Sequence, residues 1–377
     1  DKLMIQLGDF VVRKQKQLML AMGVLIVTLI VFIPKNELND VFVHYFDETI
    51  SFRQDADYID KHLTGLYIVD YSLESGIEGG ISEPGFLDEV EGFADWYREQ
   101  AETRHVNIYT EVIKRLNKNM HGDKKEWYKI PEERNLAAQY LLMYEMSLPY
   151  GLDLNNQIDI NKSSLRMTVS IQTLSSNEII ELENRAQNWL SENSKYIKVA
   201  NGTGPTVMFA NIGKRNIDSM LKGTTLALVL ISGILIFAFR SVKTGLISMV
   251  PNLVPAAMGF GLWGLFVGEV GLALSVVTTM TLGIVVDDTV HFLSKYLRAK
   301  REHGSSAADA VRYAFKHVGR ALLTTSIVLV AGFMVLAQSH FELNSGMGIL
   351  TSIIITFALL ADFFFLPPLL MKLEKKS

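Results

Sequence analysis

The sequence predicts a membrane α-helical bundle of six transmembrane helices that carries one large extracytoplasmic α+β domain. Six apolar runs support the bundle, one near the N-terminus and five after residue 220. A long segment of mixed polarity separates the first run from the other five, and it is long enough for a hydrophobic core of its own. Lys and Arg residues gather in alternate loops, which is typical of a membrane protein with a defined orientation.

Composition and charge exclude several classes of protein and site. The chain of 377 residues contains no cysteine, which rules out disulfides, thiolate metal sites and cysteine nucleophiles. Its net charge of −4 gives no reason to expect nucleic acid, whose binders concentrate basic charge on one face. The sequence GTGP at 202–205 indicates a turn rather than a phosphate site, because no GK[ST] follows it. We therefore expect no cofactor, no metal ion and no nucleic-acid partner.

The first apolar run covers residues 18–33 and follows the basic residues Arg13, Lys14 and Lys16. It is shorter than the roughly 20 residues that a spanning helix needs. No small-residue cleavage site follows it, so we interpret it as an uncleaved first transmembrane helix rather than a signal peptide. Residues 1–17 then form a cytoplasmic N-terminal segment.

The later runs predict a five-helix transmembrane domain over residues 220–371, followed by a cytoplasmic tail at 372–377. Each run is long enough to cross a hydrocarbon core about 30 Å thick. Six such runs in one chain argue against buried core helices of a soluble protein. The five runs cover roughly residues 221–239, 246–267, 271–294, 321–338 and 346–371.

The basic residues of the loops predict the orientation of the chain. The loop 295–320 is rich in Lys and Arg, whereas the short loops 268–271 and 339–345 contain neither. Because cytoplasmic loops carry the excess of basic residues, both termini are expected in the cytoplasm and residues 34–219 outside it. The lack of cysteine and the size of this insert favour a bacterial inner membrane, with the insert in the periplasm.

Strand-like and helix-like patterns follow one another twice within the insert, which predicts two split βαβ subdomains side by side. Phe86, Phe93 and Trp96 form an aromatic stripe at helical spacing, and we interpret it as core rather than a ligand site. The expected strands lie at 65–73, near 106–108, at 165–173 and near 196–200, and the expected helices at 83–100, 111–120, 131–148 and 176–193.

The stretch TLGIVVDDTVHFL, residues 281–293, places three ionisable groups in an apolar run. A charge near the centre of a spanning helix costs about 2.5–3.5 kcal/mol on insertion scales, so such groups indicate function. His291 lies four residues after Asp287 and three after Asp288, and can therefore reach either carboxylate. Two neighbouring carboxylates in a low dielectric resist ionising together, which suits a proton relay.

Hydroxyl groups near these acids favour a functional site. Hydrogen bonds in the bundle interior are offered by Ser275, Thr278, Thr279 and Thr281 on the same helix, and by Thr324, Thr325 and Ser326 on the next. A structural alternative stays open, in which the acids only form a helix-end salt bridge with Lys295 or Arg298. No group among these residues predicts a metal site.

The chain resembles one half of a transporter of the resistance-nodulation-division (RND) superfamily. One helix, a large extracytoplasmic insert and five further helices, with GIVVDD in the fourth helix, form the pattern of such a half. The resemblance is in particular to the mycobacterial-membrane-protein-large (MMPL) type and the hydrophobe exporters grouped with it, which are related to sterol-sensing domains. The matching residues are Gly283, Asp287, Asp288, His291 and Phe292, with RALLTTSIVLVAGF at 320–333 and DFFFLPPLL at 362–370.

The resemblance implies proton-driven secondary active export of lipids or other hydrophobic molecules. It assigns Asp287 and Asp288 as proton carriers, with His291, Thr324 and Thr325 as their partners. The insert is then a porter domain that takes substrate from the outer leaflet and passes it on, with or without periplasmic partners. Sodium is an alternative coupling ion, because carboxylates and hydroxyls also ligate hard cations.

Most members of the superfamily have two such halves and twelve helices in one chain. This sequence has six, so it is expected to be a C-terminal half. It would pair with a second RND half, either in the same polypeptide or in a homo- or hetero-oligomer.

Two other functions compete with coupled transport. A sterol-sensing-like lipid receptor or scaffold would use the same fold without pumping. An enzyme is not expected, since intramembrane aspartyl proteases place their two acids on different helices, and a hydrolase using Ser294 and His291 lacks an orienting acid. A second buried acid, Asp362, is interpreted as a helix-packing or interfacial group.

Overall fold

The computed structural model describes residues 2–149, 151, 153–198 and 200–374. The chain divides into two compact units. The helical unit comprises residues 1–40, 45–47 and 213–377, and the sheet unit comprises residues 41–44 and 48–212.

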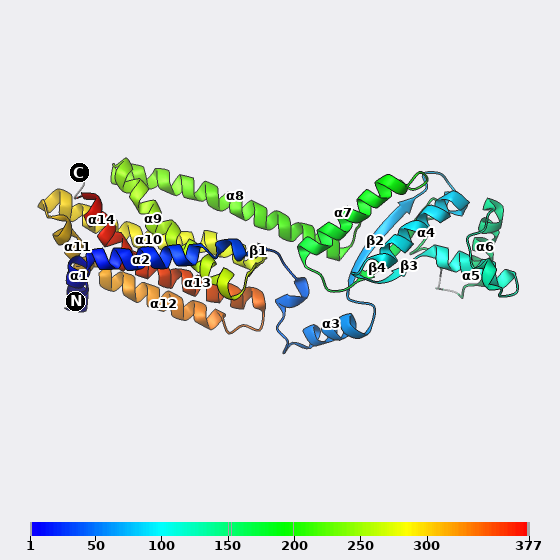
Figure 1. The fold of residues 1–377 in the computed structure, drawn as a ribbon, viewed down its shortest axis with the longest axis horizontal. Helices are drawn as coiled ribbons and strands as arrows, with labels where there is room; N and C mark the ends of the chain where they lie inside the picture. Colours follow the sequence, from blue (N-terminus) through cyan, green and yellow to red (C-terminus); the bar gives the residue numbers. More distant parts are fainter. Residues whose placement is uncertain (1, 150, 152, 199, 375–377) are drawn as a thin grey trace. The chain divides into compact units, whose positions relative to one another are not determined.

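The helical unit contains helices that are long and apolar enough to span a membrane, and six such spans lie within the described residues, which confirms the predicted number. By length and composition the spans are Gln15–Lys35, Pro205–Phe239, Val242–Phe266, Leu272–His303, Ala307–Leu336 and Glu342–Glu374. Their helices are α2 (Gln15–Ile30), α8 (Pro205–Phe239), α9 (Val242–Phe266), α10 (Leu272–His303), α12 (Arg320–Leu336) and α13 (Glu342–Leu360), joined by the shorter α1 (Lys2–Arg13), α11 (Ala307–Ala314) and α14 (Leu366–Glu374) (Figure 1).

Glycines let some of these helices approach each other closely. A Cβ atom added to Gly261 of α9 would lie 2.0 Å from the Leu29 carbonyl oxygen of α2. A Cβ atom added to Gly348 of α13 would lie 2.6 Å from the Phe333 carbonyl oxygen of α12. Small residues at helix contacts are typical of membrane bundles, where close van der Waals packing replaces the hydrophobic effect.

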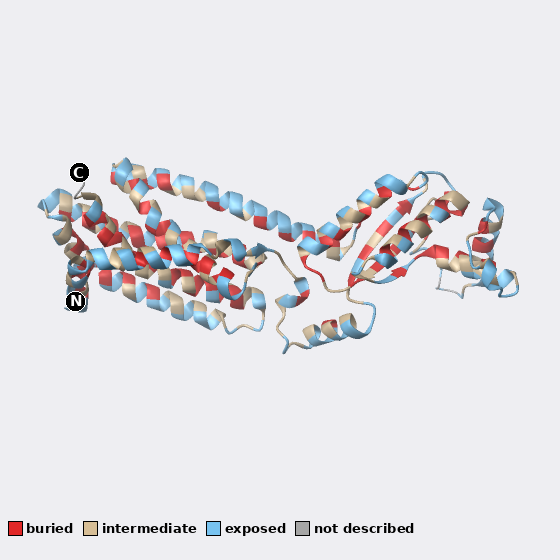
Figure 2. Cartoon of the chain, viewed as in Figure 1, coloured by how far each residue is buried: buried red, intermediate tan, exposed pale blue. Residues whose placement is uncertain are grey.

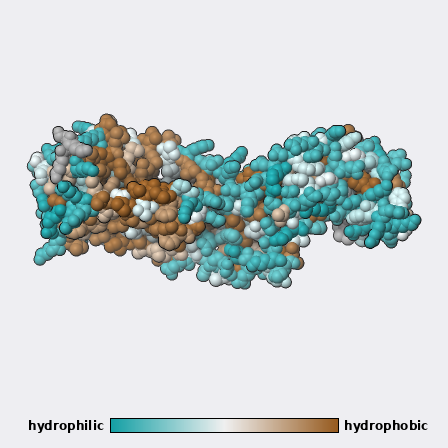
Figure 3. Space-filling view, in the orientation of Figure 1, coloured by the Kyte–Doolittle hydropathy of each residue, from teal (hydrophilic) through white to brown (hydrophobic). Residues whose placement is uncertain are grey.

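The surfaces of the two units differ in polarity. Figure 3 shows apolar side chains over much of the helical unit, whereas the visible face of the sheet unit is mostly hydrophilic. Figure 2 shows α8 and α12 with long exposed faces, and large side chains such as Phe237 and Val335 are 85% and 70% exposed there. An apolar outer surface of this kind is expected of a bundle whose solvent is lipid.

The sheet unit is built on one three-stranded antiparallel sheet with the order β2-β4-β3. Since β2 and β3 both run antiparallel to β4, they are parallel to each other, and α4 connects them as the crossover of a split βαβ unit. The strands are β2 (Tyr67–Glu74), β3 (Thr103–Asn107) and β4 (Ser164–Ile171), and the helices are α3 (Ser51–His62), α4 (Pro84–Glu99), α5 (Tyr109–Met120), α6 (Arg134–Ser147) and α7 (Ser176–Asn193) (Figure 1).

The prediction of two split βαβ subdomains is wrong for the described residues, which form one such sheet. Strand β4, expected to begin a second sheet, is instead the centre of the first, with β2 on one edge and β3 on the other. The expected strand near 196–200 is not a regular strand in its described residues, and residue 199 lies outside them. The edge of β2 that does not pair with β4 nevertheless makes backbone hydrogen bonds with this segment and the residues after it. The Lys198 N–H donates to Glu74 O, and Thr203 and Asp70 bond to each other. The alternating pattern of a strand identifies its buried face, but not its partner.

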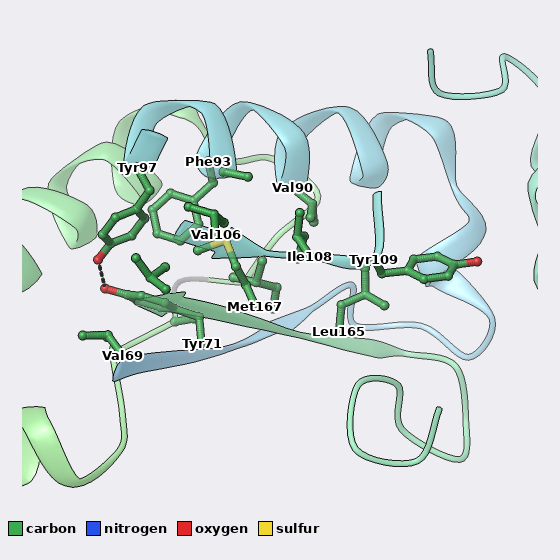
Figure 4. Packing of buried hydrophobic residues seen from close by; sticks show 14 of the residues in the cluster. Val69, Tyr71, Val90, Phe93, Tyr97, Val106, Ile108, Tyr109, Leu165 and Met167 are labelled. Carbon is green, nitrogen blue, oxygen red and sulfur yellow. Dashed lines mark hydrogen bonds between the residues drawn. The ribbon is translucent and has the colours of Figure 1, made fainter. Parts of the chain in front are cut away.

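The core of the sheet unit lies between the sheet and α4 (Figure 4). Phe86 and Phe93 are fully buried and Trp96 is partly buried against the same cluster, which confirms that the aromatic stripe is core. Tyr71 of β2 and Tyr97 of α4 share a hydrogen bond of 2.6 Å within this core.

Candidate functional site

Helix α10 holds the predicted acids near its middle. Asp287 lies 15 residues after Leu272, about 22 Å along the helix axis at about 1.5 Å per residue. The next basic residue of α10, Lys295, lies about 12 Å further on. By length alone, both distances fit a position inside a hydrocarbon core about 30 Å thick.

The two acids point to different sides of α10. The side chain of Asp287 is 71% exposed and that of His291 is 59% exposed, with Nε2 of His291 3.4 Å from Oδ1 of Asp287. Asp288 is 8% exposed and faces the inside of the helical unit. Because successive residues of a helix are rotated by about 100°, adjacent acids cannot share one face.

Asp288 lies in a buried polar cluster with residues of two other elements. Ser326 of α12 is 2% exposed and interacts with Asp288. Thr289 of α10 is fully buried, and its hydroxyl donates to Oδ1 of Asp362 over 3.0 Å. Asp362, in the π-helical turn Ala361–Phe365 between α13 and α14, is 1% exposed.

Three of the predicted supporting hydroxyls lie elsewhere. Thr324 and Thr325 are exposed on α12 and donate to carbonyls of their own helix, Thr324 to Arg320 O at 2.9 Å and Thr325 to Ala321 O at 3.0 Å. Thr281 is fully buried but donates to Val277 O at 2.7 Å. These three hydroxyls satisfy helix carbonyls, and within the described residues none of them bonds to Asp287 or Asp288.

Thr281 also lines a small cavity of about 20 Å³ with Thr224 of α8 and Asn252 of α9. A cavity of this size holds about one water molecule. The cavity is lined by no acid, so it is separate from the cluster around Asp288.

Of the hydroxyls that do face the acids, the sequence predicts Ser326 but not Thr289, which follows Asp288 directly. The signal that could have found Thr289 is helical phase, since a step of one residue turns a side chain by about 100°. Asp362 is expected to be a helix-packing or interfacial group, and in the structure it accepts a hydrogen bond from Thr289.

The salt-bridge alternative is not the arrangement seen in the described residues. Arg298 pairs with Glu302 at 2.7 Å, while Asp287 lies 3.4 Å from His291. Within the same described residues, no group of three or more His, Asp or Glu side chains is placed to hold a metal ion. The arrangement is one that can hold protons, with one acid on each side of a spanning helix.

Comparisons with known proteins identify the family to which this sequence belongs. The protein MJ1562 of Methanocaldococcus jannaschii is 24% identical to this chain over 182 residues, and its name describes it as a membrane protein. That match covers 47% of this chain and 45% of the relative, so the chain spans less than half the length of this curated relative. The sequence profile of the MMPL family matches residues 163–375, which is more than half of the 377 residues and includes Asp287, Asp288 and Asp362. The family resemblance of the sequence is thereby confirmed, and this membrane protein belongs to the MMPL family.

Proposed function

We propose that the chain is one half of a proton-driven exporter of lipids or other hydrophobic molecules. Membership of the MMPL family supports a transporter-type role. The observation that carries the proposal is the pair of adjacent acids in the middle of α10, with Asp288 buried and Asp287 exposed beside His291. Ionisable groups at this depth are rare because burying their charge costs free energy, and those that are retained commonly serve transport.

The exposed acid also implies a covering partner in the membrane. Gly283, Asp287, His291 and Ser294 form an exposed stripe along α10, here called the outward stripe. If this stripe faced lipid, the charge of Asp287 alone would cost about 2.5–3.5 kcal/mol. We therefore propose that a second six-helix half, in the same polypeptide or in another subunit, packs against the outward stripe.

Proton coupling then follows from the two orientations. A proton bound by Asp288 inside one half can pass to Asp287 or His291 at the contact between halves, with one proton lost by one group and gained by the other. Each protonation state changes the charge of that contact, and so favours a different packing of the two halves. The sheet unit is assigned as an extracytoplasmic porter domain, which receives the substrate and passes it on.

The proposal is tested by comparing the lipids of both membrane leaflets in three strains. One lacks the protein, one carries Asp287→Asn with Asp288→Asn, and one carries the control Glu302→Gln, an exposed acid further along α10. Accumulation of the same molecule in the first two strains, but not in the third, supports coupled export. If the double variant matches wild type while the deletion does not, coupled transport is wrong and a sterol-sensing-like receptor becomes the better account.

The choice between protons and sodium is open to the same strains. Export measured in inverted vesicles should follow an imposed proton gradient and be indifferent to a sodium gradient. Export that follows the sodium gradient and not the proton gradient would mean that the same site couples to sodium.

The covering partner can be tested by cross-linking, because the chain contains no cysteine of its own. Gly283→Cys places one thiol on the outward stripe, at a position with no atom within 4 Å of an added Cβ. Phe237→Cys, at an exposed position on α8, is the control. Disulfide-linked dimers at 283 but not at 237 support a second copy of this chain as partner, and their absence contradicts it.

A further inference from the structure

Asp362 is a buried acid that the proposed coupling groups on α10 do not include. It is 1% exposed, and its Oδ1 accepts one hydrogen bond, from the Thr289 hydroxyl at 3.0 Å. Its Oδ2 has no hydrogen-bond partner in the part of the chain that the structure describes. A carboxylate with one neutral donor and one bare oxygen is strongly disfavoured in a low dielectric, so the neutral carboxylic acid fits this position.

The backbone around Asp362 departs from the regular hydrogen bonding of an α-helix. In the π-helical turn Ala361–Phe365, the Leu366 N–H donates to Ala361 O, five residues back rather than four. Pro367 and Pro368 follow, and proline has no N–H to donate. π-Helical turns occur frequently at functional sites. Here the irregular turn coincides with the buried acid.

The charged surroundings of Asp362 are sparse. The titratable group that interacts with it electrostatically is Asp288 on α10. The other elements packed on this turn are α2, α9, α13, α14 and the turn Phe315–Gly319. Their charged residues lie near the helix ends or at exposed positions, at Lys16, Lys243, Lys316, His317, Glu342, Lys372 and Glu374. His291 is a basic group that acts on Asp288, whereas no basic group among the described residues acts on Asp362. Two neighbouring buried acids are costly to ionise together, which favours a proton on one of them.

A hydroxyl group of a neighbouring helix lies beside the same pair. The Ser326 hydroxyl of α12 is 2% exposed and interacts with the Asp288 carboxylate. It can donate to Asp288 when that carboxylate is ionised, and accept when it is protonated. The cluster therefore has polar groups available for either protonation state.

Aromatic rings pack together on the elements that carry the two acids. Phe315, in the π-helical turn Phe315–Gly319, makes edge contacts with Phe292 at 5.4 Å and with Phe363 at 5.3 Å between ring centroids. Phe292 lies one turn after Asp288, and Phe363 is adjacent to Asp362. All three rings are buried, at 0–3% exposure. Their burial shows that the elements carrying the two acids pack together in an apolar part of the helical unit, where a neutral carboxyl group is favoured over a charged one.

We propose that Asp288 and Asp362 form a buried proton-binding site within a single half, in which Asp362 is a second proton-carrying residue. The inference rests on the proposed function, since it adds a carrier to the same coupling mechanism. When Asp288 loses its proton toward the outward stripe, the proton on Oδ2 of Asp362 moves to Asp288. One proton leaves Asp362 and one arrives at Asp288, and the Thr289 hydroxyl stabilises the carboxylate left behind.

Infrared difference spectroscopy tests this site directly, using the full chain in lipid nanodiscs at a series of pH values. Protonated carboxyl groups absorb at a different infrared frequency from carboxylates. The wild type is expected to show a band of a buried carboxylic acid that changes with pH. Asp362→Asn should remove that band. Thr289→Val should shift it, because the carboxyl group loses the hydroxyl donor. The control Asp309→Asn, an exposed acid on α11, should leave it unchanged.

The outcomes separate three cases. If Asp362→Asn leaves every carboxylic-acid band in place, Asp362 is not protonated and the inference is wrong. If the band disappears with Asp362→Asn but does not respond to pH in the wild type, Asp362 is a permanently neutral packing group and the inference is also wrong. Loss of the pH response in Asp288→Asn, with the Asp362 band still present, supports the shared site.

Lipid export in cells distinguishes this inference from the proposed function. Loss of export in both Asp288→Asn and Asp362→Asn, with export restored by Asp362→Glu, supports both. Loss in Asp288→Asn alone overturns the role of Asp362 and keeps coupled transport. Normal export in Asp288→Asn overturns coupled transport itself, whatever Asp362→Asn does. Equal yield and thermal unfolding of the Asn variants show that the fold is unaffected.

Discussion

The two units of the molecule treat buried charge differently. In the sheet unit, Glu91 of α4 accepts hydrogen bonds from Lys114 at 2.5 Å and from Arg98 at 2.9 Å. Burial raises the pKa of Glu91, but the bonds from Lys114 and Arg98 and the charge of Lys114 more than offset it, so the pKa lies below its ordinary value. This partly buried charge is compensated by opposite charges.

In the helical unit, Asp362 is buried more completely and receives one bond, from a neutral hydroxyl. A compensated charge such as Glu91 can be part of a stable fold, whereas an uncompensated buried acid lowers stability. Retaining an acid in the second environment is understandable where it binds and releases protons. The comparison therefore distinguishes a charge that stabilises the fold, as at Glu91, from a buried acid that we propose to carry protons, as at Asp362.

The largest expected effect tests whether the aromatic core holds the sheet unit. The ring of Phe93 is fully buried, stacks on Trp189 at 5.4 Å and makes an edge contact with Tyr71 at 5.2 Å. Phe93→Ala should lower the free energy of unfolding by about 3–5 kcal/mol. Tryptophan fluorescence during denaturant unfolding of the full chain measures it, with the exposed-site variant Leu142→Ala as control. A loss below about 1 kcal/mol would mean that the core is not organised around this ring.

The second prediction concerns the contact between α2 and α9 in the helical unit. Gly261→Leu places a side chain where a single Cβ atom would already lie 2.0 Å from Leu29 O. Overpacking of this kind should destabilise the bundle by about 1–3 kcal/mol, seen as a lower midpoint of thermal unfolding in detergent. Gly23→Ala on α2, with no atom within 4 Å of the added Cβ, is the matched control. Equal midpoints for both variants would refute the close approach of these helices.

The third prediction tests the compensated charge. Glu91→Gln removes the anion between Lys114 and Arg98, and should destabilise the sheet unit by about 1–2 kcal/mol at neutral pH. Since the pKa of Glu91 is lowered in the folded protein, its stabilising effect is present above the ordinary glutamate pKa. It is lost as the pH falls through the lowered value, so wild type and variant should converge in acid. Unfolding measured across this pH range checks the sign, and a constant difference at all pH values would contradict it.

The smallest expected effect concerns helix caps. Ser175 forms a capping box with Glu178 at the start of α7, whereas α10 begins at Leu272 with no side-chain cap. Ser175→Ala should therefore destabilise the sheet unit by about 1 kcal/mol. The exposed Ser191→Ala on the same helix is the control, and both are measured by denaturant unfolding. An identical result for the two serines would mean that the cap contributes nothing.

Much of the fold could be predicted from the sequence. The six spans, the helices at 83–100 and 176–193 and the buried stripe of Phe86 and Phe93 follow from local periodicity, which is a property of adjacent residues. The partner of β4 could not be predicted, because an alternating strand fits any edge with the same register of apolar side chains. That is why one sheet was expected to be two.

The sequence by itself determined that ionisable groups lie inside a membrane helix, because length and polarity along one chain are enough to establish it. It also determined that Asp287 and His291 can meet, since they are four residues apart on a helix. Only the tertiary structure decided that Asp287 faces outward while Asp288 faces inward. Only the tertiary structure brought Thr289 to Asp362, 73 positions away. The rotation of a helix about its axis is set by the helices packed around it, and its own sequence does not specify which neighbour each face meets.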